Sequence, residues 1–293
     1  MAEGGVSGTA TSRARWIILP AIRDHEAWRS AIAAATQAAG LNLIDWDAAP
    51  LADARDDPAA ILLTKDADAA AAAGADPERT TVVLGGGAPD VEAVPEGADR
   101  NALLLHLTQH LARAEAFAGA RVVGVRDLNG APVELAPGLN VAPPPTAAPS
   151  DLARNLTLYG RPDAAVTWGP SFFTFDPRNA DQGPRTGEMD LTGRPRFLIH
   201  GPYIVMPPGR WKAVFRLSFD RPGSRVRFRL DWGGQTEYDS EEFIPGKPGQ
   251  FEIEMDYVWR EPAPAEFRIL VMEGVFDGRL TFGGVKVSRM SDV

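Results

Sequence analysis

The sequence contains no cysteine. A disulfide, a thiol nucleophile and a thiolate metal site are therefore excluded, and such a chain fits a reducing compartment. It also lacks any apolar run close to the roughly 20 residues of a membrane helix. The first apolar run, WIILPAI, is much shorter, and the N-terminal stretch before it has no apolar core of signal-peptide length. We therefore expect a soluble, cytoplasmic protein with no membrane insertion.

A surplus of basic residues is missing as well. The chain carries 30 Lys and Arg against 39 Asp and Glu, a net charge of −9. Residues 1–150 hold 11 basic and 19 acidic side chains, and residues 151–293 hold 19 and 20. Phosphate backbones are bound by clustered cations, so nucleic acid is not an expected partner.

The amino-acid composition differs between the two halves of the chain. Its 293 residues are enough for two domains, and the first half is rich in alanine, whereas all four tyrosines lie in the second half. The pattern predicts four segments: a disordered N-terminus (1–13), a small α/β domain (14–128), a Pro-rich linker (129–150) and a β-sandwich domain (151–293).

The first domain alternates short apolar runs with helical stretches. The runs predict strands at 15–22, 41–47, 59–66, 80–87 and 121–128, and the intervening sequence predicts helices at 24–40, 66–79 and 101–119. Continuous apolar strands separated by helices favour a parallel sheet covered on both faces. We expect a doubly wound, flavodoxin-like domain without catalysis that docks or dimerises, which would make a homo-oligomer. After it, six prolines within residues 131–150 predict an extended spacer.

The second domain shows a period of two. In WKAVFRLSF the residues Trp211, Phe215 and Phe219 point one way while Lys212 and Arg216 point the other. Many such segments, separated by Gly, Pro, Asn and Asp, predict a β-sandwich or jelly roll.

Alternation gathers charges of both signs on one polar sheet face: Arg216, Arg227, Arg229, Glu252, Glu254, Asp256 and Arg268. One interpretation is a solvated face tied by cross-strand ion pairs. The other is a groove in which Arg and carboxylate groups bind sugar hydroxyls. Three aromatic residues near strand ends are candidates for a stacking platform in that groove: Trp168, Tyr203 and Tyr238.

A resemblance supports the second interpretation. The stretch GPYIVMPPGRWKAVFRLSFD, followed by FRLDW, PGQFEIEMDYVW and FRILVMEGVFDGRLTFGGVKVSR, resembles β-sandwich modules attached to bacterial glycosyltransferases and other polysaccharide-biosynthesis proteins. It covers about residues 160–290. Such modules are similar in shape to carbohydrate-binding jelly rolls, so the resemblance implies glycan binding, with a glycan or a polysaccharide-synthesis protein as partner.

Two further possibilities stay open. Asp45 and Asp47 in IDWD follow a strand, as does the carboxylate pair that holds a metal and a sugar nucleotide in glycosyltransferases. No cofactor is otherwise expected, although acidic residues in the second half could supply oxygen ligands to a structural calcium ion: Asp176, Asp181, Asp239, Glu241, Glu242 and Asp277.

The sequence therefore predicts a non-enzymatic, two-domain protein whose β-sandwich binds carbohydrate in bacterial polysaccharide or cell-envelope glycan synthesis. The alternatives are a divergent glycosyltransferase-like enzyme using Asp45 and Asp47, and a structural or regulatory interaction module without a small ligand.

Overall fold

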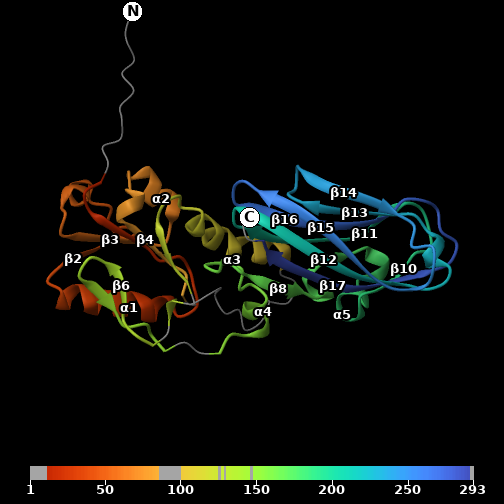
Figure 1. Cartoon of the computed structure of the whole chain (residues 1–293), viewed down its shortest axis with the longest axis horizontal. Helices are drawn as coiled ribbons and strands as arrows, with labels where there is room; N and C mark the ends of the chain where they lie inside the picture. The colour runs from red at the N-terminus through yellow and green to blue at the C-terminus, as the bar shows by residue number, and fades with distance from the viewer. Residues whose placement is uncertain (1–11, 86–99, 125–126, 129, 146–147, 291–293) are drawn as a thin grey trace, which may run out of the picture. The chain divides into compact units, whose positions relative to one another are not determined.

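The chain divides into two compact units in the computed structural model shown in Figure 1, in which residues 12–85, 100–124, 127–128, 130–145 and 148–290 are described. Unit 1 comprises Met1–Asp90 and Arg113–Ala148, and unit 2 comprises Val91–Ala112 and Pro149–Val293. Most of the expected disordered N-terminus lies outside the described residues. Ser12 does not: its amide donates to the Gly74 carbonyl at 3.0 Å, so the predicted boundary after residue 13 falls too late.

Unit 1 contains a five-stranded, all-parallel sheet with the order β2-β3-β1-β4-β5. Its strands are β1 (Arg15–Ile18), β2 (Asn42–Asp45), β3 (Ala60–Thr64), β4 (Thr80–Val83) and β5 (Arg121–Val123). All residues of β3 and β4 are buried, as continuous apolar runs predict. The parallel sheet is confirmed. The flavodoxin-like assignment is not, because a flavodoxin-like sheet has the order 2-1-3-4-5.

The helices of unit 1 lie near the predicted positions. They are α1 (His25–Ala38) and α2 (Ala67–Ala72), and α3 (Arg100–Glu115) contains the boundary between the units. Helix α1 buries Trp28 and Ile32 and ends before Gly40, whose φ of 66° only glycine adopts readily. None of the helices in the described ranges has the length and hydropathy to cross a membrane.

Part of the predicted linker is a folded hairpin. Strands β6 (Val133–Ala136) and β7 (Leu139–Val141) pair antiparallel, and Gly138 makes the turn with a φ of 78°. Leu135 is buried and its carbonyl accepts a hydrogen bond of 2.6 Å from Thr81 Oγ1 of β4. The prediction of an extended spacer is wrong here, because alternating apolar residues give the hairpin a face to bury against unit 1.

Unit 2 contains two five-stranded antiparallel sheets. Sheet I has the order β10-β17-β12-β15, with β8 also on β17, and sheet II has the order β14-β13-β16-β11-β9. The bounds in sheet I are β8 (Ala165–Trp168), β10 (Glu188–Asp190), β12 (Gly209–Phe219), β15 (Gly249–Trp259) and β17 (Arg279–Arg289). Those in sheet II are β9 (Thr174–Phe175), β11 (Arg196–Met206), β13 (Phe228–Gly233), β14 (Tyr238–Phe243) and β16 (Ala263–Val271).

Aromatic side chains join the two sheets into a sandwich. Phe215 of β12 stacks on Phe267 of β16 with ring centroids 4.0 Å apart, and Trp232 of β13 meets Trp259 of β15 at 5.1 Å. All four are buried. They are the inward-facing residues that alternation predicts, so the β-sandwich is confirmed.

Unit 2 also contains α-helical segments. These are α4 (Asp151–Arg154), α5 (Gly183–Thr186) and the first part of α3, which was predicted to belong to the α/β domain. In α3 the buried hydroxyl of Thr108 accepts a hydrogen bond of 2.9 Å from the Val205 amide of β11. This bond satisfies a backbone donor of sheet II from outside the sheet.

Candidate functional site

The charged face expected on one sheet is divided between two. Arg216 lies on β12 of sheet I and Glu252, Glu254 and Asp256 lie beside it on β15. By contrast, Arg229 and Arg268 lie on β13 and β16 of sheet II, and Arg227 precedes β13. Alternation assigns a residue to the inside or the outside of a sheet, but it does not indicate which sheet a strand joins. The prediction that all these charges share one sheet face is therefore wrong.

The outer face of sheet I is closed by cross-strand ion pairs. They join Arg210 to Asp256 at 2.8 Å, Lys212 to Glu254 at 2.9 Å and Arg216 to Glu252 at 3.1 Å. A groove of about 470 Å³ lies beside the last pair, and its wall includes one aromatic residue, Phe251. The Glu254 pair raises the pKa of Lys212. These contacts match the interpretation of a solvated, self-paired face.

The outer face of sheet II is built over a buried carboxylate. Asp231 of β13 is 2% exposed, and its Oδ1 accepts from Arg229 Nε and from Ser240 Oγ, both at 2.7 Å. Its Oδ2 lies 3.1 Å from Arg268 Nε. The Arg268 guanidinium in turn lies over the Tyr238 ring, with Cζ 3.9 Å from the ring centroid. One buried anion therefore holds two arginines and a tyrosine in place.

A break in β11 turns two side chains to the same face. The pairing of β11 with β16 shifts register between Pro202 and Val205, and Tyr203 adopts a φ of 62°. In a regular strand, residues three apart point to opposite faces, but here His200 Nδ1 lies 3.0 Å from Tyr203 Oη. A left-handed conformation is costly for tyrosine, so the surrounding contacts must hold it.

The hydrogen bonds fix the protonation of this group. Tyr203 donates its single O–H to Glu266 Oε1 at 3.0 Å, so His200 must donate from Nδ1 to the same hydroxyl oxygen. Its Nε2 is then an acceptor. Burial lowers the pKa of His200, the Glu266 carboxylate raises it and the Arg268 guanidinium lowers it, with the net shift downward. The neutral imidazole is thus the stable form at neutral pH.

These residues line a cleft of about 480 Å³ on sheet II. Phe197 at its side is 49% exposed. The full lining is Thr174, Phe175, Asp176, Pro177, Phe197, Leu198, His200, Tyr203, Glu266 and Arg268. Asp176 is already engaged, because its carboxylate accepts from the Arg178 amide and pairs with Arg196. The acceptors left for a ligand are His200 Nε2 and Glu266 Oε2, neither of which has a donor among the described residues.

The structure thus brings together four of the predicted site residues, Tyr203, Arg229, Tyr238 and Arg268. Trp168 is not among them: it is fully buried and its Nε1 donates to the Asn155 carbonyl at 3.0 Å, so the prediction of an exposed platform is wrong. It lies on the inward face of β8, since Val166 and Trp168 alternate with exposed neighbours. Arg227 is exposed, and its amide donates to Glu273 at 2.9 Å.

Sequence reasoning missed Phe197, His200 and Glu266. Glu266 could have been found, because it lies two residues before Arg268 on β16 and therefore shares its face. Phe197 and His200 could not, since two register shifts in β11 break the period of two on which the assignment depends.

In unit 1 the predicted acidic pair lies in a pocket of about 310 Å³ beyond β1, β2 and β3. Asp45 pairs with Arg29, and its Oδ1 accepts from the backbone amides of Asp47 and Ala48. Asp47 accepts from Thr64 Oγ1 at 2.6 Å and from the Lys65 amide at 2.9 Å. Both carboxylates already accept hydrogen bonds from loop donors, and that of Asp45 also pairs with a guanidinium group. This arrangement counts against a site for a metal ion and a nucleotide.

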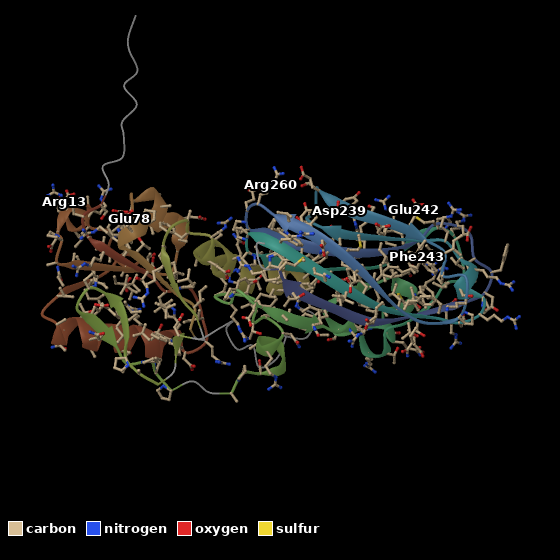
Figure 2. All side chains as sticks on the ribbon, in the orientation of Figure 1. Arg13, Glu78, Asp239, Glu242, Phe243 and Arg260 are labelled. Atoms are coloured by element: carbon tan, nitrogen blue, oxygen red, sulfur yellow. The ribbon has the colours of Figure 1, made fainter. Side chains whose placement is uncertain are left out.

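The acidic residues proposed for calcium do not gather. Asp239, Glu241 and Glu242 lie on β14 at the edge of sheet II and not in a loop; Figure 2 labels Asp239 and Glu242 along that edge. Within the described ranges, no three His, Asp or Glu side chains come together closely enough to hold a metal ion.

Comparisons with known proteins give structural neighbours alone. No protein-family model matches the chain, and no curated protein matches it. The carbohydrate-binding module TmCBM61, in complex with β-1,4-galactotriose, is 16% identical over 43% of this chain and 83% of its own, with a TM-score of 0.29. A family 35 carbohydrate-binding module from Clostridium thermocellum is 9% identical over 44% and 99%, with a TM-score of 0.28.

A third neighbour is dimeric latent PorU from Porphyromonas gingivalis. It is 10% identical over 44% of this chain and 13% of its own, with a TM-score of 0.28. Identities and scores this low establish no shared function. They leave open the attachment to glycosyltransferases that the sequence resemblance implied.

Proposed function

We propose that unit 2 is a non-catalytic carbohydrate-binding module and that the cleft on sheet II holds one or two sugar residues. The observation that carries this proposal is the pair of acceptors, His200 Nε2 and Glu266 Oε2, beside the exposed ring of Phe197. Sugar hydroxyls are hydrogen-bond donors, and the C–H face of a pyranose packs on an aromatic ring. The volume of about 480 Å³ falls in the usual range of small-ligand sites.

The support around the cleft suits binding without chemistry. Arg268 lies between the Tyr238 ring at 3.9 Å and the Phe197 ring at 5.9 Å, and its charge is balanced by Asp231. The register shift that turns His200 and Tyr203 to one face places the acceptors before a ligand arrives. Preorganisation of this kind lowers the entropic cost of binding.

The biological setting is a further part of the proposal. The resemblance of residues 160–290 to modules of polysaccharide-biosynthesis proteins suggests a role in bacterial polysaccharide or cell-envelope glycan synthesis. In that setting unit 1 is a docking or dimerising unit, for a protein of the same pathway or for a second copy of this chain.

The test is a glycan-array screen of the full chain, followed by calorimetry with the best ligand. We expect Glu266→Gln to weaken binding at least about tenfold, because a hydrogen bond to a charged group contributes about 1.5–3 kcal/mol. Phe197→Ala should weaken it by a similar factor, because the sugar loses the apolar surface of the ring. Glu252→Gln, on the outer face of sheet I, is the matched control and should bind as the unaltered chain does.

Three results would contradict the proposal. If Glu252→Gln abolished binding while Glu266→Gln did not, the groove on sheet I would be the site. If no glycan bound the full chain, unit 2 would not be a carbohydrate-binding module. Release of sugar from a nucleotide donor, abolished by Asp45→Asn, would instead assign an enzyme activity to unit 1.

A further inference from the structure

Four loops converge at one end of the unit 2 sandwich, where the paired strands of both sheets end (Figure 1). They are residues 191–195, 220–227, 244–248 and 272–278. Gly193 and Val275 exchange two backbone hydrogen bonds of 2.8 Å, and the Gly246 amide donates to the Ser224 carbonyl at 2.7 Å. The Met272 amide donates to the Arg227 carbonyl at 2.9 Å, so all four loops lie side by side.

An apolar side chain is held out from this end into solvent. Phe276 is 97% exposed, although Val275 next to it is buried and bridged to Gly193. Gly278 packs on Gly223 so closely that a Cβ there would lie 2.8 Å from the Gly223 nitrogen. The base of the loop is therefore anchored on both sides of Phe276, and the ring lies in solvent.

Ile244, at the start of the loop 244–248, is 50% exposed. Two of the four loops at this end therefore each present a large apolar side chain to solvent.

The same loop end carries several cations. Six exposed basic side chains lie in or directly beside the four loops: Arg194, Arg221, Arg225, Arg227, Lys247 and Arg279. In the described part of the chain none of the six has an ion-pair partner within 4.0 Å. Four acids lie in or directly beside the same loops: Asp190, Asp220, Glu273 and Asp277. Three of them accept from backbone amides, Asp190 from Thr192, Asp220 from Gly223 and Glu273 from Arg227. The local excess of positive charge is opposite to the net charge of −9 of the whole chain.

We propose that this loop end docks on the surface of an anionic phospholipid bilayer. Phe276 and Ile244 enter the boundary between headgroups and acyl chains, and the six cations face the anionic headgroups. Apolar insertion beside a ring of Arg and Lys is the combination that reversible binding at a bilayer surface requires. A soluble polyanion would engage the cations but would leave Ile244 without a role. The contact is peripheral, needs no spanning segment, and does not depend on the proposed carbohydrate site.

The experiment is co-sedimentation of the full chain with vesicles of phosphatidylcholine alone and with vesicles in which about a third of the lipid is phosphatidylserine. We expect binding to the anionic vesicles only, and weaker binding at high salt. Phe276→Ala should weaken it about tenfold through lost apolar contact. The double change Arg225→Glu with Arg227→Glu should weaken it at least as much, since each cation near such a surface contributes about a fivefold factor.

Two exposed positions serve as matched controls. β15 leaves the loop end at Gly249; exposed Val258 lies near its other end, and exposed Arg260 directly follows the strand there. Val258→Ala and Arg260→Glu should therefore bind as the unaltered chain does. Equal thermal unfolding of all variants confirms that folding is intact.

Absence of binding to anionic vesicles would overturn the proposal, and so would equal binding to both vesicle types. Equal effects of the test and control variants would overturn it too. Binding to soluble polyphosphate without binding to vesicles would assign the cations to a soluble polyanion and exclude the lipid surface.

Discussion

The carboxylate under the sheet II cleft allows a quantitative prediction. Asp231 is 2% exposed and balances two guanidinium groups, Arg229 at 2.7 Å and Arg268 at 3.1 Å. Asp231→Asn keeps the shape of the side chain but removes the counter-charge of both arginines, whose side chains are 29% and 15% exposed, from a position that is itself 2% exposed. Removing one partner of a buried ion pair costs about 3–5 kcal/mol. We expect the lower end, about 3 kcal/mol, because both arginines remain partly hydrated and the amide keeps one acceptor for Ser240 or an arginine.

The assay is urea and thermal unfolding of the full chain, followed by tryptophan fluorescence. For a unit of this size, 3 kcal/mol corresponds to a fall in Tm of roughly 6–12 °C. The control is Glu252→Gln, which removes an ion pair whose two side chains are each 60% exposed and should cost less than about 1 kcal/mol. A loss below 1 kcal/mol for Asp231→Asn, or equal losses for the two variants, would refute the reasoning from burial.

Two other predictions concern the core and the cleft. Phe267→Ala should cost about 3–5 kcal/mol in urea denaturation, because the ring is fully buried against Phe215, whereas Phe276→Ala should change stability by less than about 0.5 kcal/mol; equal costs would contradict the assignment of the core. The pKa of His200 lies below 6.5 in the folded chain, so at a pH between the two values the unfolded chain binds a proton at this residue that the folded chain does not bind. The free energy of unfolding should therefore rise with pH between that lowered pKa and 6.5 and level off above 6.5. The rise should be smaller in His200→Gln. Thermal unfolding at pH values from about 5 to 8 measures this dependence, and a stability that falls with rising pH would contradict it.

The cleft was partly predictable from the sequence. Tyr203, Tyr238, Arg229 and Arg268 were named because alternation places the arginines outward and because the tyrosines lie near turns. That Tyr203 and Arg268 line the cleft, with Tyr238 and Arg229 packed beside Arg268 and Asp231, depends on which strands pair, and so does the position of Arg216 and Glu252 on another sheet. Pairing brings β13 beside β16, and the residues that pair across them are about forty apart in the sequence.

What the sequence alone determined is the set of local structures and their inward faces. Apolar residues recur with a period of two in the strands and of about 3.6 in the helices, and Gly40 and Gly138 make turns at positive φ. These local features depend only on neighbouring residues, and they predict the parallel sheet and the sandwich. Tertiary structure alone decided the hairpin in the predicted linker, the burial of Trp168 and the turn of His200 toward Tyr203. Each of these features depends on a contact with a segment that is distant in the sequence. Periodicity within one segment shows which side chains face inward but not which other segment they pack against.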